Sequence, residues 1–345
     1  MSGGAAGGAG ARFLRRAARR FPALRKLSGV RALLRARLRT RVAGPAESGD
    51  AITDRFFRYE ATFDPQEVMR RHAVPDPAPR PGFLVNFLGV AIEPRFFPSI
   101  LDGKAGQVEG VPIPANWHAD IAEWGAALRA VDLARGSFTV VELGCGWGCW
   151  LNNTGVAARR AGLDVRLVGV EGDEGHIGFA REATATNGFL PSQVELHRGI
   201  AAATSGVALF PKQEKAGEAW GLEPVFGATE AQRRDAVGSG DYDEVPMVAL
   251  GELARPHARV DLLHVDIQGG EADLVAGTLD TLRAKVAYLL VGTHSRRIEE
   301  RLRDTLLRAG WRLEIERPAI LGPGDSLVVD GVQGWRNPAL LPEAA

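Results

Sequence analysis

Apolar runs and stretches of helical periodicity alternate along the second half of the chain. The apolar runs are continuous and rich in β-branched residues, and they do not alternate with polar residues. Continuous apolar strands are expected where helices cover both faces of a sheet. We therefore predict buried, parallel strands in the segments FTVVELG, DVRLVGVEGD, QVELHRG, RVDLLHVDIQ and KVAYLLVGTH.

Segments with apolar residues at helical spacing separate these runs. We predict helices near 149–161, 174–187, 270–283 and 295–309. Strands that alternate with helices in this way form a doubly wound, mostly parallel α/β sheet of the Rossmann-like type, with helices on both faces. The last two apolar segments, WRLEIERP and DSLVVDGVQGW, predict a hairpin that supplies an antiparallel edge strand.

The part of the chain before the first predicted strand divides into three pieces. Residues 1–49 form a basic tail, and 50–114 form an N-terminal extension with the proline-rich connector PDPAPRP. Within the extension, FLVNFLGVAIEPRFFP predicts extended chain with a turn. A helix over 116–134, with Asn116 as its cap, then leads to the main domain, predicted at 115–335 and followed by a tail at 336–345.

Composition places the chain among globular proteins. It has 345 residues, of which 45% are hydrophobic and 24% are charged. Apolar runs such as VAYLLV are much shorter than the roughly 20 residues that cross a bilayer. Two cysteines and the lack of a secretory h-region indicate a reducing, cytoplasmic setting.

The formal net charge of zero conceals a strong asymmetry. Twelve of the 42 basic residues lie in residues 1–45, which contain no acidic residue, so 30 basic residues face 42 acidic ones in the rest of the chain. The segment 12–41 is basic and amphipathic, which suits an anionic membrane surface such as the inner face of a membrane. A transit peptide and a solvated tail are the alternatives. We expect no nucleic-acid partner, because the body is acidic and no aromatic RNA motif follows the tail.

The segment ELGCGWGCW follows the first predicted strand directly. A structural zinc site would need two more Cys or His ligands beside Cys145 and Cys149, so we predict no metal there and interpret both cysteines as packing residues. Gly144, Gly146 and Gly148 form G-x-G-x-G, whereas the dinucleotide fingerprint is G-x-G-x-x-G. The loop is therefore a candidate cradle for a different cofactor.

Two carboxylates accompany this loop. Glu171 ends the next predicted strand, where it can accept hydrogen bonds from ribose hydroxyls. Glu142 precedes the loop and is close enough to contact a positive amino group. A ribose and an ammonium without a phosphate indicate S-adenosylmethionine, and the predicted cofactor-binding residues are Glu142, Gly144, Cys145, Gly146, Gly148, Glu171 and Gly172.

The predicted catalytic residues come from the next two strands. Asp266 follows RVDLLHV and His294 ends VGTH, so both lie at carboxyl ends of neighbouring strands. A histidine with an ordinary pKa is a suitable general base at neutral pH. Gln268 is a candidate substrate-binding residue, Glu271 either shapes the site or favours its helix N-terminus, and His264 is predicted to be a core residue.

Tryptophans supply two further candidates for acceptor binding. Residues 200–259 form a long, irregular connection that we interpret as a lid insertion, with Trp220 as a wall of the acceptor site. Trp117 precedes the first strand and is predicted to close over the site. The acceptor itself is expected to be a small molecule or a glycan.

Several motifs together resemble one enzyme family. VVELGCGWG looks like the first motif of methyltransferases, and VDLLHVDIQGGEADLV, VAYLLVGTHS and GWRLEIERP resemble the FkbM family of S-adenosylmethionine-dependent methyltransferases. The likeness covers residues 115–320, and Gln268 stands where the family usually has a glutamate. The resemblance implies a class I methyltransferase fold and methyl transfer to a hydroxyl of a sugar or natural product.

Two other functions stay open from the sequence. N-methylation of an amine is one, although the Asn/Asp-Pro-Pro-Tyr signature is replaced here by DIQGG. The other is a Rossmann-like protein that binds the cofactor or a nucleotide without turnover and is tethered by its basic tail.

Overall fold

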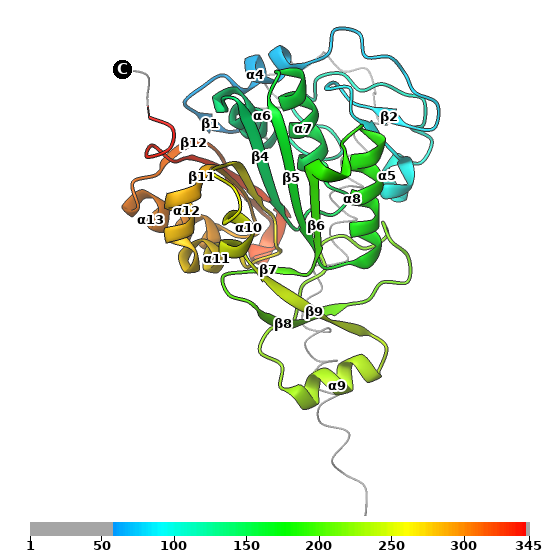
Figure 1. Ribbon diagram of the computed structural model, residues 1–345, viewed down its shortest axis with the longest axis vertical. Coiled ribbons are helices and arrows are strands. Elements are labelled where there is room, and N and C mark those ends of the chain that lie inside the picture. Colours follow the sequence, from blue (N-terminus) through cyan, green and yellow to red (C-terminus); the bar gives the residue numbers. More distant parts are fainter. Residues whose placement is uncertain (1–57, 343–345) are drawn as a thin grey trace, which may run out of the picture.

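The computed structural model describes residues 58–342, and an eight-stranded sheet forms its centre (Figure 1). Neighbouring strands among β4, β5, β6, β10 and β11 run parallel, whereas β15 is antiparallel to both of its neighbours. This is the doubly wound, mostly parallel sheet that the sequence predicts. In spatial order the strands are β1 (Glu60–Ala61), β12 (Arg312–Arg317), β15 (Gly331–Arg336), β11 (Val286–Thr293), β10 (Val260–Val265), β4 (Ser137–Leu143), β5 (Asp164–Glu171) and β6 (Val194–Arg198).

The order of the strands reverses between β4 and β10. From β4 the chain adds β5 and β6 on one side, and it then returns to add β10 and β11 on the other. The two strands at the reversal are parallel and in register, with His264 opposite Glu142. Ligands of open α/β sheets bind beyond the carboxyl ends of the strands at such a switch point. The topology therefore directs attention to the residues that follow β4 and β10.

Helices cover the two faces of the sheet. On one face lie α6 (Ile121–Leu133), α7 (Cys149–Arg160) and α8 (Glu174–Thr186), and on the other lie α10 (Leu250–Ala254), α11 (Glu271–Gly277), α12 (Leu279–Lys285) and α13 (Arg296–Arg308). Adjacent residues of β10 illustrate the arrangement, because Leu262 belongs to one apolar cluster and Leu263 to the other. Burial on both faces explains why the strands are continuously apolar.

Two predicted helices differ from the observed ones. The helix predicted at 116–134 begins only at Ile121, because the Asp120 side chain caps it by accepting from the backbone of Ala122 and Glu123. Asn116, the predicted cap, accepts instead within a preceding turn. The helix predicted at 270–283 is interrupted at Thr278 and forms α11 and α12.

The predicted C-terminal hairpin consists of β12 and β15. The later strand, β15, enters the sheet between β11 and β12, so it is internal and β1 is the outermost strand. Two short strands, β13 (Ile320–Leu321) and β14 (Leu327–Val329), pair within the connection. Residues beyond the hairpin pack against the domain: the Asn337 side chain donates to the carbonyls of Arg283 in α12 and Val286 in β11. The described part of the predicted C-terminal tail is thus joined to the domain.

The described part of the N-terminal extension also packs into the domain. It contains α4 (Pro65–His72), α5 (Pro98–Leu101) and the antiparallel strands β2 (Leu84–Val85) and β3 (Ala91–Ile92), in agreement with the predicted turn in extended chain. Met69, Leu84 and Phe87 join the apolar cluster of α6, α7 and α8. The basic tail at 1–49, with its predicted membrane segment 12–41, lies outside the described residues. Within residues 58–342, the helices are all too short or too polar to span a bilayer.

Most of the connection between β6 and β10 has regular secondary structure. It contains β7 (Ile200–Ala202), β8 (Gly206–Pro211), α9 (Glu230–Gly238) and β9 (Tyr242–Ala249), and β9 pairs with both β7 and β8. In Figure 1, β8, β9 and α9 extend below the large sheet as an arm. The predicted lid insertion is therefore a small three-stranded sheet with its own helix, and the irregular part is confined to the chain between β8 and α9.

Candidate active site

The glycine loop after β4 is held in a left-handed conformation. Gly144, Gly146 and Gly148 have φ values of 76°, 53° and 74°, a region that residues with a Cβ atom rarely adopt. A Cβ atom on Gly144 would collide with the carbonyl oxygen of Asp266, and one on Gly146 would lie 2.6 Å from Cζ3 of Trp220. The glycines therefore allow two other segments to approach the loop closely.

Glu171 lies beside this loop at the end of β5. Its Oε2 accepts a hydrogen bond from the backbone N–H of Gly146 at 2.8 Å, and its Oε1 accepts one from Asp173 at 2.9 Å. Burial raises the pKa of this carboxyl group to about 7. At the next position, Gly172 lets Phe210 of β8 pack against the backbone, since a Cβ atom there would lie 2.8 Å from the ring. The carboxylate is thus fixed in position beside the glycine loop.

Glu142 faces the helix that follows the glycine loop. Its two carboxylate oxygens accept hydrogen bonds from the backbone N–H groups of Trp150 and Leu151, in the first turn of α7, at 3.1 and 2.9 Å. Unpaired N–H groups at a helix N-terminus attract a carboxylate, and burial raises the pKa of Glu142 to about 7. In the described structure both oxygens thus bind the helix that follows the loop, and the contact with an amino group of the cofactor stays a prediction.

Both cysteines of the motif are buried. A Cβ atom on Gly169 would lie 2.9 Å from Sγ of Cys145, so this side chain packs behind the loop as predicted. Cys149 has polar neighbours, since its Sγ contacts His118 and accepts from the Asn153 side chain. Burial raises the pKa of both thiols well above the usual value.

Asp266 and His294 meet at the carboxyl ends of β10 and β11. Nε2 of His294 lies 3.3 Å from Oδ1 of Asp266, and Nδ1 lies 2.9 Å from Oε1 of Glu271. Burial alone would lower the pKa of His294, but the hydrogen bonds to the two carboxylates raise it well above the usual value. The expectation of an ordinary pKa is therefore wrong, because the imidazole lies between two carboxylates.

Gln268 contacts both Asp266 and the segment of chain between β8 and α9. Its side-chain amide donates to Oδ1 of Asp266 at 3.0 Å, and a Cβ atom on Gly221 would lie 3.0 Å from its Oε1. The backbone of Gln268 has a φ of 59°, which is unusual for a residue with a side chain. Strain of this kind persists where the surrounding structure enforces it, and it is concentrated at functional sites.

Trp220 lies over the glycine loop. Its indole ring stacks between Phe97 and His176, with ring centroids 4.0 and 3.8 Å apart. Trp117 contacts the other side of this group, with a centroid distance of 5.4 Å to Phe97, and its Nε1 donates to Glu109. The structure therefore places Trp220 on Gly146, and its contact with an acceptor stays a prediction.

His264 lies in β10 opposite Glu142 of β4 and is buried, as predicted for a core residue. Its ring nitrogens are 3.6 Å from Oε1 of Glu123 and 3.9 Å from Oε1 of Glu142, in ion-pair contact without a hydrogen bond. Burial would lower the pKa of His264, but the two glutamates raise it. Its role is therefore electrostatic as well as steric.

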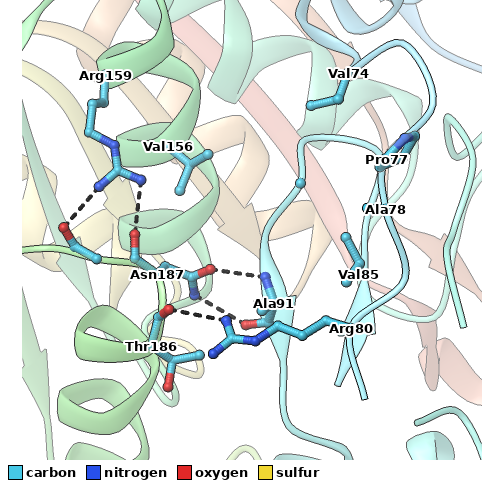
Figure 2. Close-up of a pocket in the computed structure, with 12 residues that line it drawn as sticks. Val74, Pro77, Ala78, Arg80, Val85, Ala91, Val156, Arg159, Thr186 and Asn187 are labelled. Carbon is cyan, nitrogen blue, oxygen red and sulfur yellow. Dashed lines mark hydrogen bonds between the residues drawn. The ribbon is translucent and has the colours of Figure 1, made fainter. Parts of the chain in front are cut away.

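A separate cavity of about 450 Å³ lies at the opposite end of α7 and α8 (Figure 2). Two arginines border it, and both donate to main-chain carbonyls at the end of α8: Arg159 to Asn187 and Gly188, and Arg80 to Thr186. Cationic side chains commonly satisfy the free carbonyls of a helix C-terminus. We assign these arginines a structural role.

Three contacts of the site were not foreseen from the sequence. From the sequence, Glu271 was expected only to shape the site or to favour a helix N-terminus, yet its Oε1 forms a hydrogen bond with Nδ1 of His294. Phe97 and His176 enclose Trp220 from elements far apart in the chain. The segment DIQGGE carried a signal for Glu271, while nothing in the local sequence indicates the aromatic stack.

Comparison with known proteins gives one strong match. A protein of Jannaschia sp. (strain CCS1) with the description "Putative methyltransferase" is 47% identical over 264 residues, which cover 75% of this chain and 94% of the relative. No family model matches the chain.

Solved structures resemble the chain only distantly. The ribosomal protein L11 methylase of Lactobacillus delbrueckii subsp. bulgaricus has a TM-score of 0.34 at 12% identity, covering 68% of this chain and 86% of its own. The methyltransferase FkbM of Methylobacillus flagellatus KT has a TM-score of 0.40 at 12% identity, covering 62% and 54%.

Proposed function

The chain belongs to the methyltransferase family, as its 47% identical relative shows, and from this premise we propose that it transfers a methyl group from S-adenosylmethionine to a hydroxyl oxygen. One observation carries the proposal: the glycine loop and Asp266 touch across the switch point of the sheet. A donor cradle and a proton-accepting group therefore share one crevice. The FkbM type of methyltransferase, indicated by the sequence motifs, is part of the proposal.

The residues around the glycine loop are suited to bind the ribose of S-adenosylmethionine. Glu171 offers a buried carboxylate next to a loop whose three left-handed glycines carry no side chains of their own. It would accept hydrogen bonds from the ribose hydroxyls, as acids at this position do for nucleotide cofactors. The backbone of Gly144 to Gly148 would lie against the cofactor, and Trp220 would cover it on the side of Gly146.

When bound, S-adenosylmethionine would supply an electrophilic methyl group for an acceptor hydroxyl, with the electron pair of its C–S bond left on sulfur. The protein has to hold the acceptor hydroxyl in line and take up its proton. Asp266 is 40% exposed and is held by His294 and Gln268, so it is placed to receive that proton. His294 is itself fixed by Glu271, which gives the group a defined orientation.

The acidic character of this group favours a hydroxyl acceptor over an amine. A hydroxyl group loses its proton on methylation and needs a base beside it, which the carboxylates provide. We propose a sugar, a glycan or a small hydroxylated natural product as the acceptor. Gln268, Trp117 and the arm formed by β8, α9 and β9 would bound the acceptor side.

A screen with isotope-labelled S-adenosylmethionine tests this function. Matched acceptors that differ only in a hydroxyl or an amino group, such as a methyl glucoside and its 2-amino analogue, are incubated with the full chain and analysed by mass spectrometry. We expect label on hydroxylated acceptors, and a loss of at least about a hundredfold for Asp266→Asn, the order of general-base contributions. Label on amines alone would contradict the proposal.

The exposed Asp273 provides a matched control. It lies in α11, close to Asp266 in sequence, and pairs with Arg301 at the surface. Asp273→Asn removes a carboxylate of the same kind and is expected to leave transfer unchanged.

A further inference from the structure

Three side chains converge beside the glycine loop in the geometry of a cation site. One ligand atom from each of Asp266, Glu271 and His294 lies within 4.8 Å of the others. Ligands of a small divalent ion at roughly 2.1 Å are separated by about 3 Å in adjacent positions and about 4 Å in opposite ones. The observed spread therefore needs only side-chain adjustment to enclose one ion.

Glu271 provides an independent observation. It has no exposed surface, and its Oε1 accepts from the backbone of Ile267 and Gly269 as well as from His294. Its Oε2 is also buried but has no hydrogen-bond partner in the described structure. A buried carboxylate oxygen without a partner is costly, and a metal ion is a partner that can satisfy it.

The charges of the group point in the same direction. Two carboxylates lie against one imidazole, which can neutralise only one of them, and a bound divalent ion would take the place of its proton. Carboxylates suit the harder divalent ions Mg²⁺ and Mn²⁺, whereas imidazole suits first-row transition ions, so Mn²⁺ is the ion to which both ligand types apply. Asp266 is 40% exposed and His294 is 14% exposed, so an ion held here would face the crevice.

We propose that Asp266, Glu271 and His294 bind a divalent cation of the Mn²⁺ or Mg²⁺ class, which holds the acceptor hydroxyl beside the glycine loop. The part concerning the acceptor rests on the proposed function, whereas the binding of the ion does not. In this arrangement Gln268, which donates to Asp266, orients one ligand from outside the group. Side chains that orient ligands in this way support metal affinity.

Electron paramagnetic resonance with Mn²⁺ tests the site without any acceptor or cofactor. The signal of free Mn²⁺ is measured during titration of the full-length protein. We expect one site per chain, displaced by Mg²⁺, and an affinity at least about tenfold lower in Asp266→Asn and in His294→Ala. Both altered side chains are partly exposed, so these variants keep the buried Glu271 intact.

Asp273→Asn is the control, because this exposed carboxylate lies in the same helix but outside the group. It is expected to bind Mn²⁺ as the unaltered protein does. No Mn²⁺ binding at millimolar concentration, or equal binding in all four proteins, would overturn the proposal. Calorimetry with S-adenosylhomocysteine on the same samples separates the two claims. If the protein binds S-adenosylhomocysteine but not Mn²⁺, only the proposed metal site is contradicted. If it binds Mn²⁺ but not S-adenosylhomocysteine, only the proposed function is contradicted.

Discussion

The carbonyl oxygen of Asp266 occupies the space in which a Cβ atom on Gly144 would lie. The backbone hydrogen bond from Asp266 to Leu143 holds the two segments in this position. The first glycine of the loop after β4 is thus packed on the residue that follows β10. Any change at either position is transmitted directly to the other.

Gly144→Ala therefore affects both halves of the site. The new methyl group would displace the Asp266 backbone, and alanine also disfavours the φ of 76°. We expect S-adenosylhomocysteine to bind at least about tenfold more weakly, which corresponds to about 1.4 kcal/mol, and transfer to fall further. Calorimetry and initial rates measure the two effects.

Gly136 offers the matched control for this substitution. It has a φ of 73° in the turn before β4, and nothing lies within 4 Å of the position of its Cβ atom. Gly136→Ala has only the backbone cost of a positive φ, so it should lower the thermal midpoint less than Gly144→Ala does, and it should leave ligand affinity unchanged. Equal affinity in Gly144→Ala and Gly136→Ala would show that the packing of Gly144 on Asp266 does not matter for binding.

The pKa of Glu171 predicts how cofactor binding depends on pH. Burial raises this pKa to about 7 in the free protein, and only the ionised carboxylate can accept hydrogen bonds from both ribose hydroxyls. As the pH falls from 8 to 6 the carboxylate becomes protonated, so we expect the affinity for S-adenosylhomocysteine to fall by up to about tenfold. Calorimetry at a series of pH values gives the profile.

Glu171→Gln removes the titrating group and should bind more weakly at pH 8, with a flatter profile. The amino group of the ligand titrates in both proteins, so the difference between the two profiles isolates Glu171. Glu174→Gln is the control, since Glu174 is 68% exposed and pairs with Arg198 at the surface. A profile unchanged by Glu171→Gln would exclude Glu171 from the cofactor site.

Much of the fold follows from the pattern of apolar residues. Strands buried on both faces are read directly from continuous β-branched runs, and α7, α8 and α13 lie within two residues of the predicted ranges. The exact start of a helix was harder to predict where two nearby side chains could both cap it. Asp120 caps α6, although Asn116 has a similar side chain. The insertion of β15 between β11 and β12 depends on long-range pairing, which periodicity does not encode.

Site residues at the ends of strands could be predicted from the sequence, whereas contacts between segments far apart in the chain could not. Asp266 and His294 could be placed together because parallel neighbours present their carboxyl ends at one edge. Glu142 shows the limit, because its position next to the loop did not reveal that α7 would bind both of its oxygens. The stacking of Trp220 between Phe97 and His176 joins three separate parts of the chain.

Gln268→Gly separates stability from function. Glycine adopts the φ of 59° freely, which relieves about 1 kcal/mol or more of backbone strain and offsets the lost side-chain contacts. We expect a thermal midpoint within about 3 °C of the unaltered protein, the range of a sub-kcal/mol change. Transfer should fall at least about tenfold, because Asp266 loses its amide donor.

Asp76→Gly is the control for Gln268→Gly. Asp76 is the other described residue outside glycine with a left-handed backbone, with a φ of 64°, and it is exposed. Asp76→Gly is expected to leave transfer intact. Full transfer by Gln268→Gly would mean that its amide does not position Asp266.

Trp220 should report on cofactor binding. Its indole covers Gly146, so a ligand that enters the glycine loop changes its surroundings. We expect S-adenosylhomocysteine to alter the tryptophan fluorescence, and Trp220→Phe to remove most of that change. Trp311→Phe, at a buried position beside β12, is the control that should keep it. A ligand-dependent signal that survives in Trp220→Phe would place the ligand elsewhere.

Calorimetric titration of the full chain with S-adenosylmethionine and, separately, with NAD tests the central claim most directly. The G-x-G-x-G spacing and the carboxylate of Glu171 predict saturable heat with S-adenosylmethionine at one site per chain and none with NAD. Tight binding of NAD without binding of S-adenosylmethionine would contradict the account.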